Sequence, residues 1–155
     1  MILPRYRIAE SGIPGAGKGV FLEAAVKAGA VIVAPDKIER LYSRAELDAF
    51  GPDSHEDAAS VRWFEGKYTV SLDWPDECYL NHSFDPNGLW HLGFVFARRD
   101  LAPGEELTLD YRLIVGDGER LPFDDAHSGE PIIGLPWPEN LRTTTAELAR
   151  LAAAL

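Results

Sequence analysis

Two short segments, Asn81-His82-Ser83-Phe84-Asp85-Pro86-Asn87 and Gly104-Glu105-Glu106-Leu107-Thr108-Leu109-Asp110-Tyr111, decide how this sequence is interpreted. The first surrounds one aromatic residue with polar and turn-forming residues, which are costly to bury unless their polar groups have partners. The second runs from a Pro103-Gly104 turn through an acidic pair into an alternating strand that ends on a tyrosine. Neither pattern is typical of an ordinary scaffold, so both segments are candidates for a functional site.

The composition limits the class of protein. A chain of 155 residues fits one domain with a sizeable core. Its single cysteine, Cys78, excludes an intramolecular disulfide framework and a cysteine-rich zinc site, and we expect no metal. No apolar run approaches the roughly 20 residues that cross a bilayer, and the first residues lack the features of a signal peptide. We therefore expect a cytoplasmic protein with no membrane partner.

The charge balance bears on partners. The chain has 25 acidic and 15 basic residues, which gives a net charge of -10. Binding to a nucleic-acid backbone needs a basic face, so we expect no direct contact with nucleic acid. An acidic surface raises the encounter rate with a basic protein or peptide, but it also serves solubility alone. Charge does not decide between these two roles.

Short strands and turns dominate the pattern, which predicts a mainly β fold. We expect strands at residues 6–9, 19–23, 31–34 and 90–97, and a hairpin formed by 61–64 and 68–72. Cys78 is expected to be buried in a strand as a small apolar residue. Residues 51–60 are polar and are predicted to form a surface loop.

Two capping boxes predict helices. The first, at residues 43–46, opens a short helix that ends near Gly51. The second, at residues 144–147, begins a C-terminal helix with an apolar stripe that includes Leu148 and Leu151. We find no repeat and no linker that would divide the chain, so we expect a single domain.

A glycine-rich stretch near the start of the chain suggests a competing function. Residues 12–18, Gly-Ile-Pro-Gly-Ala-Gly-Lys, have the spacing of a phosphate-binding loop and, with Gly19, are similar to the loop of adenylate kinases. Such a loop needs a hydroxyl after the lysine to hold magnesium, and Gly19 and Val20 have none. The preceding segment, 5–11, alternates and carries three charges, whereas a buried parallel strand is wholly apolar. A nucleotide-binding protein is therefore the weaker alternative.

The order of these motifs resembles the SET-domain protein lysine methyltransferases. A glycine turn, the Asn-His-Ser segment and an acidic strand ending on Tyr111 follow one another from about Ser11 onward, as in a minimal bacterial-type SET protein. The resemblance implies small curved sheets, a pseudoknot-like crossing near Tyr111 and short helices, including one at the C-terminus. Residues 1–111 would form the core, and residues 112–155 would pack on it as an extension of the same domain.

The resemblance also implies a cofactor and a substrate. S-adenosylmethionine would donate a methyl group to a lysine of a basic protein or peptide. Gly17, Lys18, Gly19, Asn81 and His82 would bind the cofactor. Tyr111 would be the catalytic residue beside the transferred methyl. The reference pKa of a tyrosine hydroxyl is about 10. It therefore stays protonated at neutral pH and cannot act as an outright base.

The sequence departs from the family pattern in two places. Phe84 stands where many members have cysteine, and no cysteine follows, so the zinc cluster found after many SET domains is excluded. Residues 112–155 would have to close the lysine channel differently or leave it open, and the candidates are Phe123, Trp137 and the terminal helix. Leu109, where many members have Phe or Tyr, leaves the number of added methyl groups open.

Several alternatives remain at this point. Tyr79 and Leu109 are expected to line the lysine channel together with Trp137. A catalytically silent SET-like module that binds a basic peptide would share most of these features. An exposed stripe on the terminal helix could also support a homodimer. The sequence does not identify the protein substrate.

Overall fold

The computed structural model describes residues 1–35, 37–51 and 54–155. Within these residues the fold consists of small sheets, none with more than three strands. The strands are β1 (Tyr6–Glu10), β2 (Lys18–Leu22), β3 (Val31–Val33), β4 (Tyr42–Ser43), β5 (Ser60–Phe64), β6 (Lys67–Val70), β7 (Asn81–His82), β8 (Gly88–His91), β9 (Phe94–Ala97), β10 (Thr108–Leu109), β11 (Arg120–Asp124) and β12 (Pro131–Ile133). The helices are α1 (Arg44–Asp48), α2 (His55–Ala58) and α3 (Trp137–Ala152), with the 3-10 helices η1 (Asp76–Tyr79) and η2 (Tyr111–Leu113). The prediction of a mainly β fold with a C-terminal helix is confirmed.

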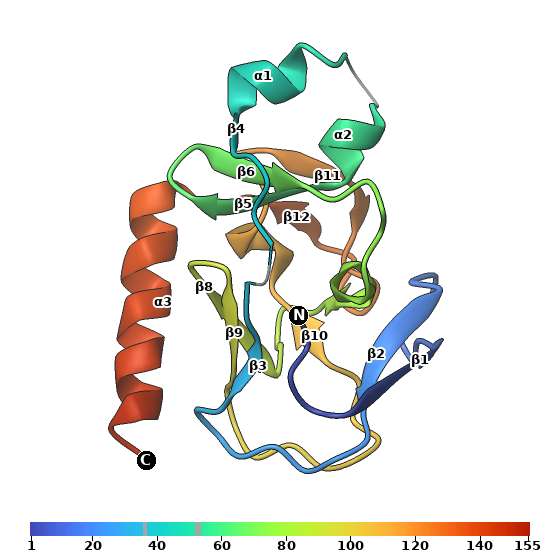
Figure 1. Ribbon diagram of the computed structural model, residues 1–155, viewed down its shortest axis with the longest axis vertical. Helices are drawn as coiled ribbons and strands as arrows, with labels where there is room; N and C mark the ends of the chain where they lie inside the picture. Colours follow the sequence, from blue (N-terminus) through green and yellow to red (C-terminus); the bar gives the residue numbers. More distant parts are fainter. Residues whose placement is uncertain (36, 52–53) are drawn as a thin grey trace.

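One parallel pairing brings distant parts of the chain together. β7 runs parallel to β10, with Asn81 beside Thr108 and His82 beside Leu109. All other strand pairs in the described sheets are antiparallel: β1-β2, β11-β12, β3-β9-β8 and β4-β6-β5. The β10 segment therefore crosses the middle of the molecule between the β1-β2 hairpin and the β3-β9-β8 sheet (Figure 1). This crossing positions the tyrosine that follows β10.

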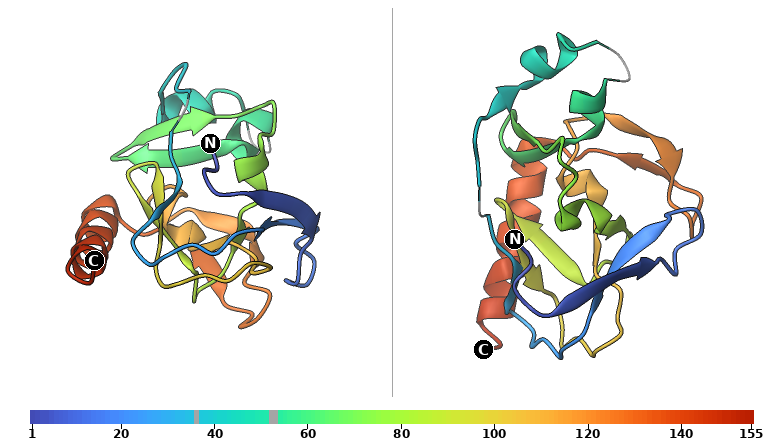
Figure 2. Two further views of the ribbon diagram at one scale, coloured as in Figure 1. Left: turned by 60° about the horizontal axis from the view of Figure 1, so that its bottom comes forward. Right: turned by 45° about the vertical axis from the view of Figure 1, so that its right-hand side comes forward.

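The core lies around this crossing. Val20 of β2, Ile32 of β3, Val95 of β9 and Leu107 before β10 are completely buried and belong to one apolar cluster. Figures 1 and 2 show α3 running along the side of β8 and β9, away from the β1-β2 hairpin. Apolar burial of this kind is the main force that holds such short strands together.

The terminal helix begins earlier than the sequence indicated. The capping box at 144–147 predicted a start near Thr144, but α3 starts at Trp137 with a proline in its first turn. Thr144 is instead buried within the helix, where its hydroxyl donates to the Asn140 carbonyl at 2.9 Å. Its oxygen also lies 2.9 Å from Nδ1 of His91 on β8. The prediction was wrong because this threonine joins the helix to the sheet rather than capping it.

Three further local predictions need correction. Residues 90–97 form the β8-β9 hairpin instead of one strand, with a turn at Leu92-Gly93. The segment expected to be a loop contains α2, whose N-cap is Ser54; Pro52 and Asp53 lie outside the described residues. Cys78 lies in η1, not in a strand. The β5-β6 hairpin and the capping box at 43–46 are confirmed.

Candidate active site

The loop between β1 and β2 is held by the carboxylate of Glu106. Its oxygens accept hydrogen bonds from the Ser11 hydroxyl at 2.6 Å, the Gly12 backbone at 2.9 Å and the Asn81 amide at 3.0 Å. The same Asn81 amide donates to the Lys18 carbonyl at 2.8 Å. One side chain thus connects the glycine turn to β7. Glu106 was not among the residues predicted for the site, although the acidic pair in the 104–111 segment was a usable signal.

Gly19 is required by this arrangement. A Cβ atom at residue 19 would lie 2.2 Å from Oε1 of Glu106 and 3.2 Å from the Asn81 amide nitrogen. The first distance is far inside van der Waals contact, so Glu106 would have to move. Gly17 is needed for a different reason, because its φ of 73° lies in the left-handed region. The glycine turn is therefore shaped by both backbone conformation and side-chain contact.

Tyr111 lies directly beyond β10, at the start of η2. Its hydroxyl donates to the Leu80 carbonyl at 2.6 Å, and its backbone N–H donates to Nδ1 of His82 at 3.1 Å. Asp110 caps η2 by accepting from the Arg112 backbone at 3.0 Å, which fixes the turn at this point. The β7-β10 crossing thus places Tyr111 against both residues that flank Asn81.

Burial keeps the Tyr111 hydroxyl protonated. Desolvation raises the pKa of Tyr111 to about 12, and the nearby Cys78 adds to the shift. A phenol of this pKa is neutral at pH 7 and serves as a hydrogen-bonding group, not as a base. Burial likewise raises the pKa of Cys78 to about 11, with Glu77 adding to the effect. The Cys78 thiol is therefore not a nucleophile at neutral pH.

A cavity of about 1090 Å³ opens beside Tyr111. Among the residues predicted for the site, it is lined by Lys18, Tyr79, Asn81, Leu109 and Tyr111. Gly17 and Gly19 flank Lys18, and the His82 ring lies 5.3 Å from the Tyr111 ring between centroids. The structure therefore gathers the predicted glycine-turn, Asn-His-Ser and tyrosine residues in one place.

The wall of the cavity is largely apolar near Tyr111. Leu80, Trp90 and Ile114 line it there, and Trp63 joins them from β5. Trp63 packs edge-to-face on Trp90 with ring centroids 6.1 Å apart, and its indole N–H donates to Thr69 at 2.7 Å. This part of the cavity therefore offers hydrocarbon and aromatic surface.

A family model of the SET domain matches residues 17–112, which is more than half of the chain. The chain belongs to the SET-domain family. This family generally comprises protein lysine methyltransferases, which generally use S-adenosylmethionine. A comparison with curated proteins gave no match. The small sheets, the crossing at β7-β10 and the C-terminal helix are the SET-type fold.

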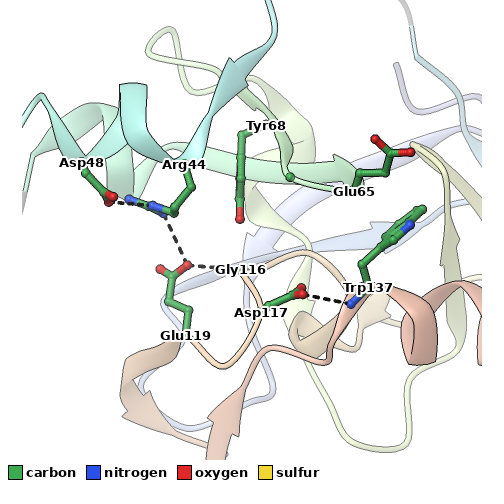
Figure 3. A pocket seen from close by; sticks show the side chains of 9 residues that line it. Arg44, Asp48, Glu65, Tyr68, Gly116, Asp117, Glu119 and Trp137 are labelled. Atoms are coloured by element: carbon green, nitrogen blue, oxygen red, sulfur yellow. Dashed lines mark hydrogen bonds and ion pairs between the residues drawn. The ribbon is translucent and has the colours of Figure 1, made fainter.

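Trp137 does not reach the cavity of this SET domain. It lies in a second cavity of about 610 Å³, together with Tyr68 and Arg44 (Figure 3). The Trp137 backbone N–H donates to Asp117 at 3.2 Å, which fixes the start of α3 at this position. Phe123 on β11 lines the main cavity instead. Of the three candidates for closing the channel, Phe123, Trp137 and the terminal helix, the structure therefore brings only Phe123 to the cavity.

The phosphate-loop interpretation is wrong for this SET domain. Residues 12–17 lead into β2, which pairs antiparallel with β1. A phosphate-binding loop delivers its backbone N–H groups at the start of a helix, where the helix dipole assists. No helix follows this loop.

Among the described residues, no helix is long and apolar enough to span a membrane.

Proposed function

We propose that this SET domain transfers a methyl group from S-adenosylmethionine to a lysine side chain of a basic protein or peptide. The observation that carries the proposal is the position of Tyr111. Its ring lines the same cavity as Asn81 and Lys18, and its hydroxyl bonds to the Leu80 carbonyl at 2.6 Å. When bound, the cofactor supplies an electrophilic methyl group on a positively charged sulfur.

The residues around the glycine turn fit this cofactor. Its methionine portion carries an ammonium and a carboxylate, which need partners of opposite charge. The Glu106 carboxylate lies against Gly19, and the Lys18 side chain lies on the cavity wall. Charge-assisted hydrogen bonds to such groups are stronger than neutral ones. Lys18 and Asn81, which line the cavity, would therefore hold this portion, while Glu106 fixes the glycine turn and Asn81, and Gly19 leaves room for Glu106.

The apolar wall favours the reactive form of a lysine. An amine that leaves water for a surface of leucine and tryptophan has its pKa lowered, and the neutral form is the nucleophile. The Tyr111 hydroxyl donates to Leu80, so its oxygen lone pairs can accept a hydrogen bond from the amine. Alignment of two reactants supplies about 7 to 11 kcal/mol in the best intramolecular cases.

The rim of the cavity suits an extended segment with apolar side chains. Exposed apolar side chains line it, namely Ile38, Phe50, Leu72, Trp74 and Phe123. Its carboxylates, Glu39, Glu56, Asp73 and Glu77, are accompanied by the cationic groups of Met1, Lys18, Lys37 and Arg40. The preference for a basic segment therefore rests on the net charge of -10 of the whole chain and not on the rim.

Cofactor binding is tested first by thermal unfolding. S-adenosylhomocysteine should raise the melting temperature, because a ligand at ~100 times its dissociation constant stabilises the folded state by about 2.7 kcal/mol. ATP with magnesium serves as the control and should cause no shift. Labelled S-adenosylmethionine with cell extract then tests transfer. Binding without any labelled protein would support the silent peptide-binding module instead.

The catalytic role is tested with Tyr111→Phe. The ring remains, but the hydroxyl that orients the amine is lost, so single-turnover methylation should fall by about tenfold or more, or at least 1.36 kcal/mol in the barrier. The folded state should lose about 1 kcal/mol, because the Leu80 carbonyl loses its donor. Tyr42→Phe, in the same cavity wall, is the matched control. Equal turnover in wild type and Tyr111→Phe would exclude this role.

A further inference from the structure

A buried aspartate from the C-terminal extension lies behind the active-site tyrosine. Asp125 follows β11 directly and is 5% exposed. Its Oδ1 lies 3.7 Å from Nε2 of His82, and both side chains are buried. Within the described structure, Nε2 of His82 has no hydrogen-bond partner. A buried N–H without an acceptor is costly, so the Asp125 carboxylate that faces Nε2 is significant.

The contacts of His82 define which nitrogen carries its proton. Nδ1 accepts a hydrogen bond from the Tyr111 backbone N–H at 3.1 Å, so Nδ1 must present a lone pair. A neutral imidazole with an unprotonated Nδ1 carries its proton on Nε2. Burial lowers the pKa of His82 despite the opposing effects of Asp110, Asp125 and the Leu109 backbone, while Arg112 lowers it further. The ring is therefore neutral at pH 7, with Nε2–H on the side of Asp125.

The two oxygens of Asp125 have different tasks. Oδ2 accepts from the backbone N–H groups of His127 at 3.1 Å and Ser128 at 2.6 Å, which closes the turn between β11 and β12. Oδ1 is the oxygen that faces His82. Burial alone would raise the pKa of Asp125, but the hydrogen bonds from Ser128 and His127 outweigh it and hold the pKa below its usual range. Asp125 is therefore ionised, with Oδ2 available to the turn and Oδ1 available to His82.

We propose that Asp125 is a positioning residue for Tyr111 that acts through His82. Oδ1 of Asp125 fixes the Nε2–H tautomer of His82, and Nδ1 of His82 holds the backbone of Tyr111. A small rotation of either side chain closes the 3.7 Å separation to a hydrogen bond. Asp125 lies outside residues 17–112, so the extension supplies part of the support for the site. The effect on rate rests on the proposed methyl transfer, but the effect on the tautomer does not.

Asp125→Asn separates this role from a role in the turn alone. Asparagine has the same shape but only one acceptor oxygen. If that oxygen stays with the His127 and Ser128 N–H groups, the amide NH₂ faces Nε2 of His82 and requires a lone pair there. The proton of the His82 ring would then move to Nδ1. There it would face the Tyr111 backbone N–H, so two hydrogen-bond donors would oppose each other. The turn survives, and the support of Tyr111 is lost.

The closing experiment measures the tautomer and the rate on the full chain. Nitrogen-15 NMR of histidine-labelled protein should show His82 as the Nε2–H tautomer in wild type and a shift toward Nδ1–H in Asp125→Asn. Single-turnover methylation should fall by about 10- to 100-fold, the range found for groups that orient the ligands of metal sites. His82 is assigned by the loss of its signals in His82→Gln. A wild-type Nδ1–H tautomer, or an unchanged tautomer or rate in Asp125→Asn, would overturn the proposal.

Ser128→Ala is the matched control. It removes a hydroxyl that accepts from the Glu130 backbone at 3.2 Å and also contacts the Asp125 carboxylate, but the backbone N–H groups of His127 and Ser128 still hold Oδ2, and Oδ1 still faces His82. This variant should lose stability while keeping the wild-type tautomer and turnover per folded molecule. A loss of turnover equal to that of Asp125→Asn would reduce Asp125 to a turn residue. If the wild-type protein transfers no methyl group, the proposed function fails, and the NMR comparison still decides whether Asp125 fixes His82.

Discussion

Much of this site depends on the hydrogen bonds of one side chain, the carboxylate of Glu106. Its carboxylate accepts from the Ser11 hydroxyl, the Gly12 backbone N–H and the Asn81 amide, which come from two separate parts of the chain. Several donors on one carboxylate compensate the cost of removing its charge from water. Because Gly19 packs against the same carboxylate, the size of residue 19 controls where Glu106 can lie.

Gly19→Ala tests this dependence. The added methyl would overlap Oε1 of Glu106 at 2.2 Å, so the folded state should lose about 1 to 3 kcal/mol, as in other overpacked sites. S-adenosylhomocysteine should also bind more weakly, as measured by calorimetry. Gly66→Ala is the control, because a Cβ there would meet nothing within 4 Å. Equal unfolding midpoints for the two variants would contradict the packing argument.

The residues of the site were predictable only where they formed a local motif. Asn81, His82 and Tyr111 follow one another in an order that the resemblance could recognise. Asp125 carries no local signal, because its relation to His82 exists only after the β11-β12 hairpin folds against β7. Trp137 was placed with the channel from its residue type alone, but its position is set by a backbone hydrogen bond to Asp117.

At the scale of elements, the β8-β9 hairpin turns through an unfavourable residue. Leu92 has a φ of 51° and Gly93 a φ of 86°, as in a turn that favours asparagine followed by glycine. Leucine gave no turn signal, which is why 90–97 was predicted as one strand. A Cβ on Gly93 would lie 2.4 Å from the Trp63 ring, so the turn is also held by packing. Tertiary contact compensates for poor local propensity here.

Leu92→Asn should therefore stabilise the protein. Asparagine tolerates the left-handed region, whereas other L-residues lose about 1 to 2 kcal/mol there. We expect a gain of about 1 kcal/mol, seen as a higher urea midpoint with an unchanged slope. Leu92→Ala removes the same exposed apolar chain, which is 40% exposed, but keeps the strained conformation. A gain of the same size in both variants would show that exposure, not backbone strain, is responsible.

At the scale of the whole molecule, two histidines link folding to pH, the buried His82 and the half-buried His91. Burial lowers the pKa of both His82 and His91 below the ordinary value of 6.5. As the pH falls through about 6.5, the unfolded chain binds protons at these rings before the folded protein does. Their contribution to stability is therefore complete above this pH and decreases as the pH falls toward the folded-state pKa values.

The expected result is a melting temperature that decreases between pH 7 and pH 5. His91→Gln removes one of the two linked groups, so its melting temperature should depend less steeply on pH than that of wild type. Thermal unfolding in buffers of constant ionic strength measures both slopes. Parallel slopes for the two proteins, or a wild-type melting temperature that rises toward pH 5, would contradict the linkage.

The overall topology could be predicted from the order of motifs, but not from local patterns. β7 and β10 have two residues each, far too short for a strand signal, and parallel pairing leaves no hairpin turn between them. Hydrophobic periodicity identified most of the antiparallel strands, because the longer ones show alternation of apolar and polar residues over four or five positions. The crossing is a purely tertiary feature, stabilised by burial of Leu107 and Leu109.

The β7-β10 crossing also affects how the protein is made. A chain leaving the ribosome exposes Asn81 and His82 well before Tyr111 and Asp125 are synthesised. Pairing between such distant segments is slow, since a long loop must close before any contact compensates for it. Until then β7 is an unpaired strand edge, open to chaperones and to neighbouring nascent chains. We therefore expect a pause in translation between β7 and β10 to lengthen this exposure and to lower the yield of folded protein.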